Sequence, residues 1–116
     1  MAKVLLADDD QTMVGLLTTL LRMDGLEVMA LDADDDVAAA VAHDPPEVLV
    51  LDVHLSHQNG LDVLAAIRSA DPGHRVRVIM ISGLNAKEES LKRGADDFLL
   101  KPFMPDELMA LLRKNI

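Results

Sequence analysis

Carboxylates occur at the ends of two apolar segments of the sequence. Three aspartates in succession, residues 8–10, follow the first segment, and Asp52 lies near the end of the second. Crowded carboxylates repel one another, and a hard divalent cation with oxygen ligands removes that repulsion. Because Mg²⁺ commonly uses only one or two protein carboxylates, a further carboxylate is free to attack phosphorus. The pattern is typical of a cation site combined with phosphoryl chemistry.

A hydroxyl and an ammonium group follow two later apolar segments, at Ser82 and Lys101. Both groups can hold phosphoryl oxygens that the cation leaves free. Asp10 has a different expected role, because it directly precedes an amphipathic segment and suits the N-cap of a helix. The sequence therefore assigns Asp8 and Asp9, but not Asp10, to the cation site.

Alternating apolar and amphipathic segments are expected to position these side chains. The predicted strands are residues 2–7, 26–31, 47–53, 76–82 and 95–100, and the predicted helices are residues 10–25, 32–46, 61–73, 85–94 and 105–115. Such alternation predicts parallel βαβ units, and nearly continuous apolar strands indicate helices on both faces of the sheet. We predict one doubly wound α/β domain over residues 1–116, with ligands at the carboxyl ends of its strands.

Composition excludes several classes of function. The chain has 116 residues, half of them hydrophobic, and 20 acidic against 11 basic residues give a net charge of −9, which repels nucleic acids and anionic lipid surfaces. Cysteine, tryptophan and tyrosine are absent, which excludes disulfides and thiolate chemistry and leaves no aromatic platform for bases. No apolar run has the length of a membrane span or the flanks of a signal peptide. We predict a cytoplasmic protein that binds neither nucleic acid nor membrane directly.

Four segments carry a resemblance to a known family. In order and spacing, LLADDD, LVLDVHLSHQNGLDVL, VIMISG and GADDFLLKPF resemble the CheY-like receiver domain of two-component response regulators, over essentially the whole chain. The resemblance implies a flavodoxin-like sheet of five parallel strands in the order 2-1-3-4-5. It also implies a phosphorylation-controlled signalling domain of a two-component or phosphorelay system.

The resemblance implies a role for each acidic residue. Asp52 would accept a phosphoryl group from a histidine kinase or a histidine phosphotransfer protein, in a reaction governed by positioning and electrostatics. Asp9, Asp52 and the backbone carbonyl of His54 would bind Mg²⁺ or Mn²⁺ directly, and Asp8 would help through water. The side chains of His54 and His57 have a metal-like spacing, but without further ligands they are assigned no metal.

Further roles concern the phosphoryl oxygens and the switch. Lys101 and Ser82 would contact the phosphoryl oxygens, and the peptide bond between Lys101 and Pro102 would be cis. On phosphorylation Ser82 would be drawn toward the phosphoryl group and Phe98 would turn inward. This movement would alter the surface of the fourth helix, fifth strand and fifth helix, which contacts an effector domain or a downstream protein.

Several positions are expected to tune access to the phosphoryl group. Gly83 leaves the site open to bulky phosphodonors, and the apolar Leu84 hinders a hydrolytic water, which predicts a phosphorylated state that does not decay unusually fast. Leu55 and Ser56 stand where receivers often have Met-Pro, so the loop stiffness is expected to differ.

The charged residues neither favour nor exclude a homodimer through the fourth helix, fifth strand and fifth helix. Many receivers of transcription factors pair in this way through charged residues, and Lys87 and Glu107 fit one such pair. Leu111, however, stands where a basic partner for Asp97 is common.

Two other functions compete with that of a phosphoacceptor. An interaction module that works without phosphorylation is disfavoured, because the acidic pocket, the hydroxyl and the lysine are all present. A phosphohydrolase of the haloacid dehalogenase kind would need a second aspartate at the position of His54. We therefore expect a domain that catalyses its own phosphorylation and dephosphorylation but is not a turnover enzyme.

Overall fold

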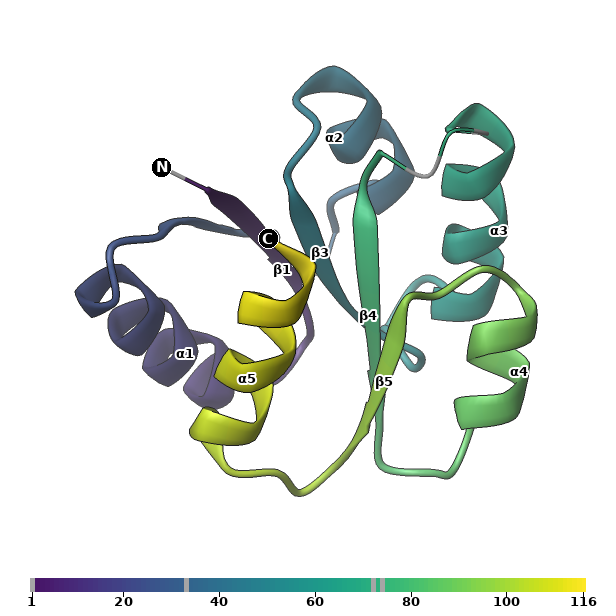
Figure 1. The fold of residues 1–116 in the computed structure, drawn as a ribbon. Coiled ribbons are helices and arrows are strands. Elements are labelled where there is room, and N and C mark those ends of the chain that lie inside the picture. Colours follow the sequence, from purple (N-terminus) through teal and green to yellow (C-terminus); the bar gives the residue numbers. More distant parts are fainter. Residues whose placement is uncertain (1, 33, 72, 74) are drawn as a thin grey trace.

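A five-stranded parallel sheet with helices on both faces forms the protein (Figure 1). The computed structural model describes residues 2–32, 34–71, 73 and 75–116. Its elements are β1 (Lys3–Ala7), α1 (Gln11–Met23), β2 (Glu27–Ala30), α2 (Val37–His43), β3 (Val48–Asp52), α3 (Gly60–Ala70), β4 (Arg77–Ser82), α4 (Lys87–Lys92), β5 (Asp97–Leu100) and α5 (Pro105–Asn115). The strand order is β2-β1-β3-β4-β5, with every neighbouring pair parallel, which confirms the predicted fold class.

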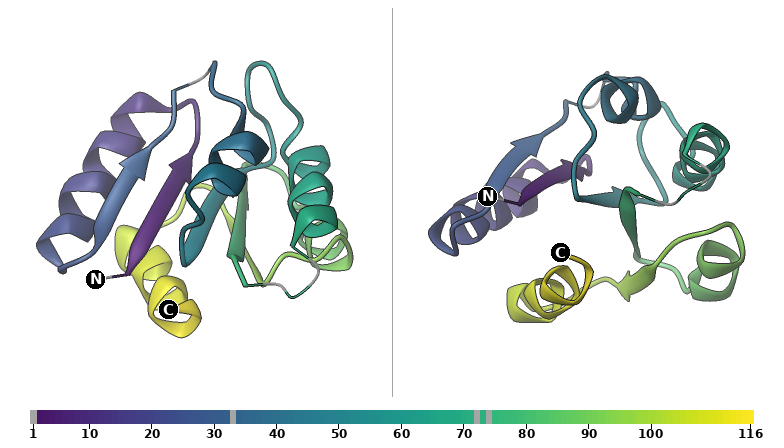
Figure 2. Two further views of the ribbon diagram at one scale, coloured as in Figure 1. Left: turned by 90° about the horizontal axis from the view of Figure 1, so that it is seen from above. Right: turned by 45° about the horizontal axis from the view of Figure 1, so that its top comes forward.

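Alternate residues of each strand supply two separate hydrophobic clusters. Leu5 and Ala7 of β1 face the cluster beneath α2 and α3, whereas Val4 and Leu6 face the cluster beneath α1 and α5. This alternation follows from the two-residue period of a strand. Figure 2 shows the two layers of helices with the sheet between them. Because both faces of the sheet are covered, the central strand β3 is buried along its whole length.

Polar residues set the ends of the helices. The Asp10 side chain accepts a hydrogen bond of 3.1 Å from the backbone N–H of Met13, which confirms it as the N-cap of α1. After α1 the chain turns at Gly25, whose φ of 86° lies in the left-handed region. Asp36 caps α2 in the same way, through the N–H of Ala39.

Predicted and observed bounds differ most at α2. We predicted a helix from residue 32, but α2 begins at Val37, because Asp36 takes the N-cap and Asp35 accepts a hydrogen bond of 2.8 Å from the N–H of Asp32 in a preceding turn. Smaller corrections shorten α1, α3, α4 and all five strands by a few residues, whereas α5 has the predicted bounds. Ala33 and Pro72, which fall within predicted helices, lie outside the described residues.

A buried arginine joins α3 to the chain around β4 and β5. The Arg68 side chain donates to the carbonyls of Gly94 at 2.8 Å and Val76 at 2.7 Å, and to Asp96 Oδ2 at 2.9 Å. Gly94 has a φ of 106°, and a Cβ there would lie 3.0 Å from Arg68 Cγ. The positive φ and the close approach of Arg68 both favour glycine at this position, which lies at the amino-terminal end of the sheet.

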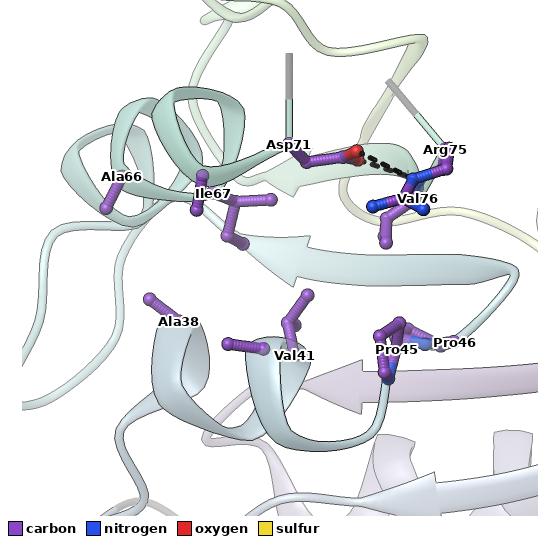
Figure 3. A pocket seen from close by; sticks show the side chains of 11 residues that line it. Ala38, Val41, Pro45, Pro46, Ala66, Ile67, Asp71, Arg75 and Val76 are labelled. Carbon is purple, nitrogen blue, oxygen red and sulfur yellow. Dashed lines mark hydrogen bonds and ion pairs between the residues drawn. The ribbon is translucent and has the colours of Figure 1, made fainter. Parts of the chain in front are cut away.

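A hollow between α2 and α3 also lies at this amino-terminal end. It has a volume of about 350 Å³, and Figure 3 shows Val41 of α2 and Ile67 of α3 pointing into it. Asp71, at its rim, accepts a hydrogen bond of 2.9 Å from the N–H of Val76. That bond, more than any other contact, lowers the pKa of Asp71 below its usual value. The hollow lies before β3 and β4, so it is remote from the carboxyl ends where ligands are expected.

Asp71→Asn is expected to lower the free energy of unfolding by about 1 kcal/mol at neutral pH, because a neutral amide oxygen accepts a weaker hydrogen bond than a carboxylate. The ionised form stabilises the protein above the unfolded pKa of about 4, and this stabilisation is lost as the pH falls through the lower folded pKa. Urea denaturation should show the gap between wild type and variant closing in acid. A gap that does not change with pH would contradict the role of the charge.

Candidate functional site

The carboxyl ends of four neighbouring strands bring the predicted side chains to one edge of the sheet. Asp8 follows β1, Asp52 ends β3, Ser82 ends β4 and Lys101 follows β5. The register places Asp52 opposite Ile81 and Ser82 opposite Leu100, so these strands end at nearly the same level. Of the predicted set, Asp8, Asp52 and Lys101 are in direct contact.

Lys101 holds two buried carboxylates together. Its Nζ lies 2.7 Å from Asp52 Oδ2 and 2.8 Å from Asp8 Oδ2, while the two aspartates are 6% and 5% exposed. Burial by itself lowers the pKa of Lys101, but the hydrogen bonds and charges of Asp52 and Asp8 outweigh burial and raise that pKa above its usual value. The ammonium is therefore charged at neutral pH, and one positive charge faces two carboxylates.

Burial dominates the environment of Asp8. Removal from water raises the pKa of Asp8 above its usual value, and the hydrogen bond with Lys101 offsets this only in part. The backbone N–H of Asp10 also donates to Asp8 Oδ1 at 2.9 Å and fixes the carboxylate against the start of α1. A second cation beside Asp8 would relieve the remaining cost of its burial.

Asp9 is turned toward a different partner. Its Oδ2 accepts hydrogen bonds from both the backbone N–H and the hydroxyl of Ser56, in the loop after β3. As the side chains stand, the described ranges contain no group of three acidic or histidine side chains arranged around a cation. The prediction that Asp8, Asp9 and Asp52 share a metal stays a prediction, and it requires a different direction for the Asp9 side chain.

The loop after Asp52 closes tightly onto the phosphoacceptor candidate. Asp52 Oδ1 accepts a hydrogen bond of 2.9 Å from the N–H of His54, and the N–H of Gly60 donates to the carbonyl of Val53 at 2.7 Å. A short antiparallel bridge joins His54 to Asn59, the residue before α3. A Cβ on Gly60 would lie 2.1 Å from the carbonyl oxygen of Asp52, so only glycine fits there.

The predicted switch and access residues lie on β4, on β5 and directly after β4. Ser82 is fully buried, and its hydroxyl oxygen accepts a hydrogen bond of 3.0 Å from the N–H of Leu84. Gly83 is exposed and Leu84 is 66% exposed, so both lie on the surface beside the site. Phe98 is partly buried and packs against the cluster beneath α2 and α3. Their roles stay predictions.

A second hollow opens beside Lys101. Its volume is about 540 Å³, and it is lined by Asp10, Met13, Gly83, Lys101, Pro102 and Phe103. The peptide bond between Lys101 and Pro102 is cis, as the resemblance implies. Lys101 thus contacts the two buried carboxylates and also lines an open hollow at the surface.

Sequence reasoning did not identify Ser56 or Gly60 as site residues. Ser56 was noted only as an unusual residue in the loop, although a hydroxyl and an N–H where proline is common were a signal for new hydrogen bonds. Gly60 follows Asn59 at the start of a helix, and this pair was a signal for a tight turn.

Comparison with known proteins decides the family. The sequence model for the response regulator receiver domain matches residues 4–113. The chain belongs to this family. Among curated relatives of this receiver domain, the transcriptional regulatory protein CpxR of Klebsiella pneumoniae is 38% identical over 116 residues, covering 97% of this chain and 48% of that protein. The DNA-binding response regulator MtrA of Mycobacterium bovis is 34% identical, covering 98% of this chain and 50% of that protein.

Solved receiver structures share the whole fold. The receiver domain of the Francisella response regulator 1452 has a TM-score of 0.89 at 28% identity, covering 98% of this chain and 95% of that chain. The chemotaxis response regulator CheY4 of Vibrio cholerae has a TM-score of 0.89 at 25% identity, covering 100% of this chain and 99% of that chain. This receiver domain spans about half the length of the curated relatives it matches. None of the helices in the described ranges has the length and apolar character needed for a bilayer crossing.

Proposed function

We propose that this receiver domain accepts a phosphoryl group on Asp52, from a histidine kinase or a histidine phosphotransfer protein, in a Mg²⁺-dependent reaction. The observation that carries the proposal is the buried carboxylate of Asp52 at the end of β3, 2.7 Å from Lys101 Nζ and beside a second buried carboxylate, Asp8. Such a center offers a nucleophile and a cationic contact for phosphoryl oxygens in one place.

The donor set fits Mg²⁺ or Mn²⁺. Buried Asp8 and Asp52 face a single ammonium, and Asp9 lies on the same loop as Asp8, so carboxylate oxygens outnumber the positive charge. Asp9, Asp52 and the carbonyl of His54 would bind the ion directly, and Asp8 would do so through water. When bound, the ion would offset the negative charge of the phosphoryl oxygens.

The residues of the chain would perform the transfer. An oxygen of Asp52 attacks phosphorus, and the new O–P bond forms as the P–N bond of the donor's phosphohistidine breaks, with the bonding electrons passing to the imidazole nitrogen. Lys101 then binds a phosphoryl oxygen of the product, and the hydroxyl of Ser82 binds another. Because the acceptor is consumed in each transfer, the domain is a switch in this proposal and not a turnover enzyme.

The output would pass through the surface of α4, β5 and α5. Ser82 would move toward the phosphoryl group and Phe98 would turn inward behind it. Exposed apolar side chains on this surface, Leu91, Leu100 and Met104, offer contacts to an effector domain or a downstream protein. We place this exchange in the cytoplasm, with no direct contact to nucleic acid or membrane by this domain.

A homodimer through the same surface stays a prediction. Asp97 already has partners within the chain, since Asn115 donates to Oδ2 at 2.9 Å and Lys114 Nζ lies 3.4 Å from Oδ1. Glu107 accepts a hydrogen bond of 2.9 Å from the N–H of Met104 at the start of α5. Lys87 of α4 is exposed and available for pairing.

Intact-mass spectrometry tests the proposed function. Incubation with a small phosphodonor and Mg²⁺ should add one phosphoryl group to the wild type, and none to Asp52→Asn or to any sample treated with EDTA. Asp62→Asn is the matched control, because Asp62 is an exposed carboxylate on α3 and its removal should leave phosphorylation unchanged. Equal labelling of Asp52→Asn and wild type would refute Asp52 as the acceptor. A folded wild type without any adduct would favour an interaction module that works without phosphorylation.

A further inference from the structure

Two loops meet at the carboxylate of Asp9. Asp9 follows β1 and Ser56 follows β3, and both donors of Ser56, its backbone N–H and its hydroxyl, bind the same oxygen, Oδ2 of Asp9. Proline, which is common at the position of Ser56 in receivers, has neither donor. The contact is therefore a property of this chain's own loop sequence.

The contact competes with a role for Asp9 in binding a cation. A carboxylate oxygen has two lone-pair sites, and two donors occupy both sites on Oδ2. In this arrangement, within the described residues, Asp9 does not form a group with Asp8 and Asp52 that could hold a metal ion, whereas Lys101 contacts both Asp8 and Asp52. With Oδ2 bound to Ser56, only Oδ1 of Asp9 is left for a cation, so the carboxylate must turn or give up hydrogen bonds to Ser56 before it can share an ion with Asp8 and Asp52.

We propose that Ser56 is a positioning residue for Asp9: its two hydrogen bonds hold the carboxylate away from Asp8 and Asp52 and so lower the affinity of this receiver domain for divalent cations. The inference rests on the proposed function, because it assumes that Asp9 is a metal ligand. Mg²⁺ binding then includes the cost of releasing Asp9 from Ser56. Loss of one or both donors should make the site bind the cation more tightly.

Binding of Mn²⁺ tests this inference without any activity measurement. The free-ion electron paramagnetic resonance signal, which falls as Mn²⁺ binds, gives the Kd for each variant. Ser56→Ala removes the hydroxyl, and Ser56→Pro removes both donors. At about 1 kcal/mol for each net hydrogen bond, the Kd should fall about 5-fold for Ser56→Ala and about 30-fold for Ser56→Pro. Ser56→Thr keeps both donors and should match the wild type.

A double-mutant cycle separates positioning from a general change in the loop. In an Asp9→Asn background, Ser56→Ala should leave the Kd unchanged, because the ligand that it releases is no longer present. An unchanged or weaker Kd for both Ser56→Ala and Ser56→Pro, in variants with wild-type circular dichroism, would overturn the inference.

Two further results distinguish this inference from the proposed function. A wild type that binds Mn²⁺ and accepts a phosphoryl group, with Ser56 variants of equal affinity, overturns the inference and leaves the function intact. Absence of Mn²⁺ binding in every variant overturns the inference, and the phosphorylation experiment with and without EDTA then decides separately on the function.

Discussion

Replacing Lys101 by methionine is expected to lower the free energy of unfolding by about 3–5 kcal/mol at neutral pH without divalent cations. The ammonium lies within 2.8 Å of both Asp8 and Asp52, and both carboxylates are buried. Methionine fills similar space but leaves two negative charges together without a cation. Urea denaturation followed by far-ultraviolet circular dichroism measures the loss, since the chain has no tryptophan for fluorescence.

The decrease in the free energy of unfolding caused by Lys101→Met should depend on pH. Burial already raises the pKa of Asp8, and removal of Lys101 raises it further, because the lysine is the main group opposing that shift. A carboxyl whose folded pKa is raised binds protons more readily in the folded state, so the variant should recover stability relative to wild type as the pH falls through that pKa. In the wild type, Lys101 continues to stabilise the folded state through neutral pH. Its pKa is itself raised, so its charge is lost only in strong base.

Two further variants test whether the stability loss of Lys101→Met is electrostatic. Lys92→Met replaces an exposed lysine of α4 and should change the free energy of unfolding by less than about 0.5 kcal/mol. Adding Asp8→Asn to Lys101→Met should restore part of the stability by removing one of the two unpaired charges. Equal, pH-independent effects of Lys101→Met and Lys92→Met would contradict an electrostatic role for Lys101 in the folded protein.

Gly60→Ala is expected to have the second large effect, a loss of about 3 kcal/mol in the free energy of unfolding. A Cβ at this position would lie 2.1 Å from the carbonyl oxygen of Asp52 and 2.7 Å from Cα of Val53. Both are backbone atoms, so no side chain can rotate to make room. The substitution must push α3 away from the end of β3, and phosphorylation of Asp52 should decline with stability because its backbone is displaced.

Gly15→Ala is the matched control for Gly60→Ala. Gly15 lies inside α1, and a Cβ there would have nothing within 4 Å. Alanine is a better helix former, so this variant should gain about 0.5–1 kcal/mol. Chemical denaturation of the two variants should therefore give changes of opposite sign. A Gly60→Ala protein as stable as wild type would show that the approach of α3 to Asp52 is not restrictive.

Much of the site could be predicted because strand ends in a parallel sheet fall at one edge. Asp8, Asp52, Ser82 and Lys101 each follow or end an apolar strand, and this position alone predicts their neighbourhood. The direction of a side chain could not be predicted in this way. Asp9 is next to Asp8 in the sequence, yet its partner is Ser56, 47 residues away in another loop.

Loop contacts and helix starts were the parts that the sequence could not settle. Hydrophobic periodicity predicts the position of α2. It does not predict which of the five acidic or small residues before Val37 becomes the N-cap, because Asp35 and Asp36 both suit turns. The restriction at Gly60 depends on how closely α3 approaches β3, a distance set by packing in three dimensions.

The Arg68 contacts hold the chain just beyond the carboxyl end of α4. The Arg68 side chain donates a hydrogen bond to the carbonyl of Gly94, just beyond the carboxyl end of α4. The amino end of α4 follows the exposed residues Gly83 and Leu84. In the proposed switch, a displacement that begins at Ser82 would reach the amino end of α4 first, while the hydrogen bond from Arg68 holds the chain at Gly94. The first turn of α4 would then move further than its carboxyl end.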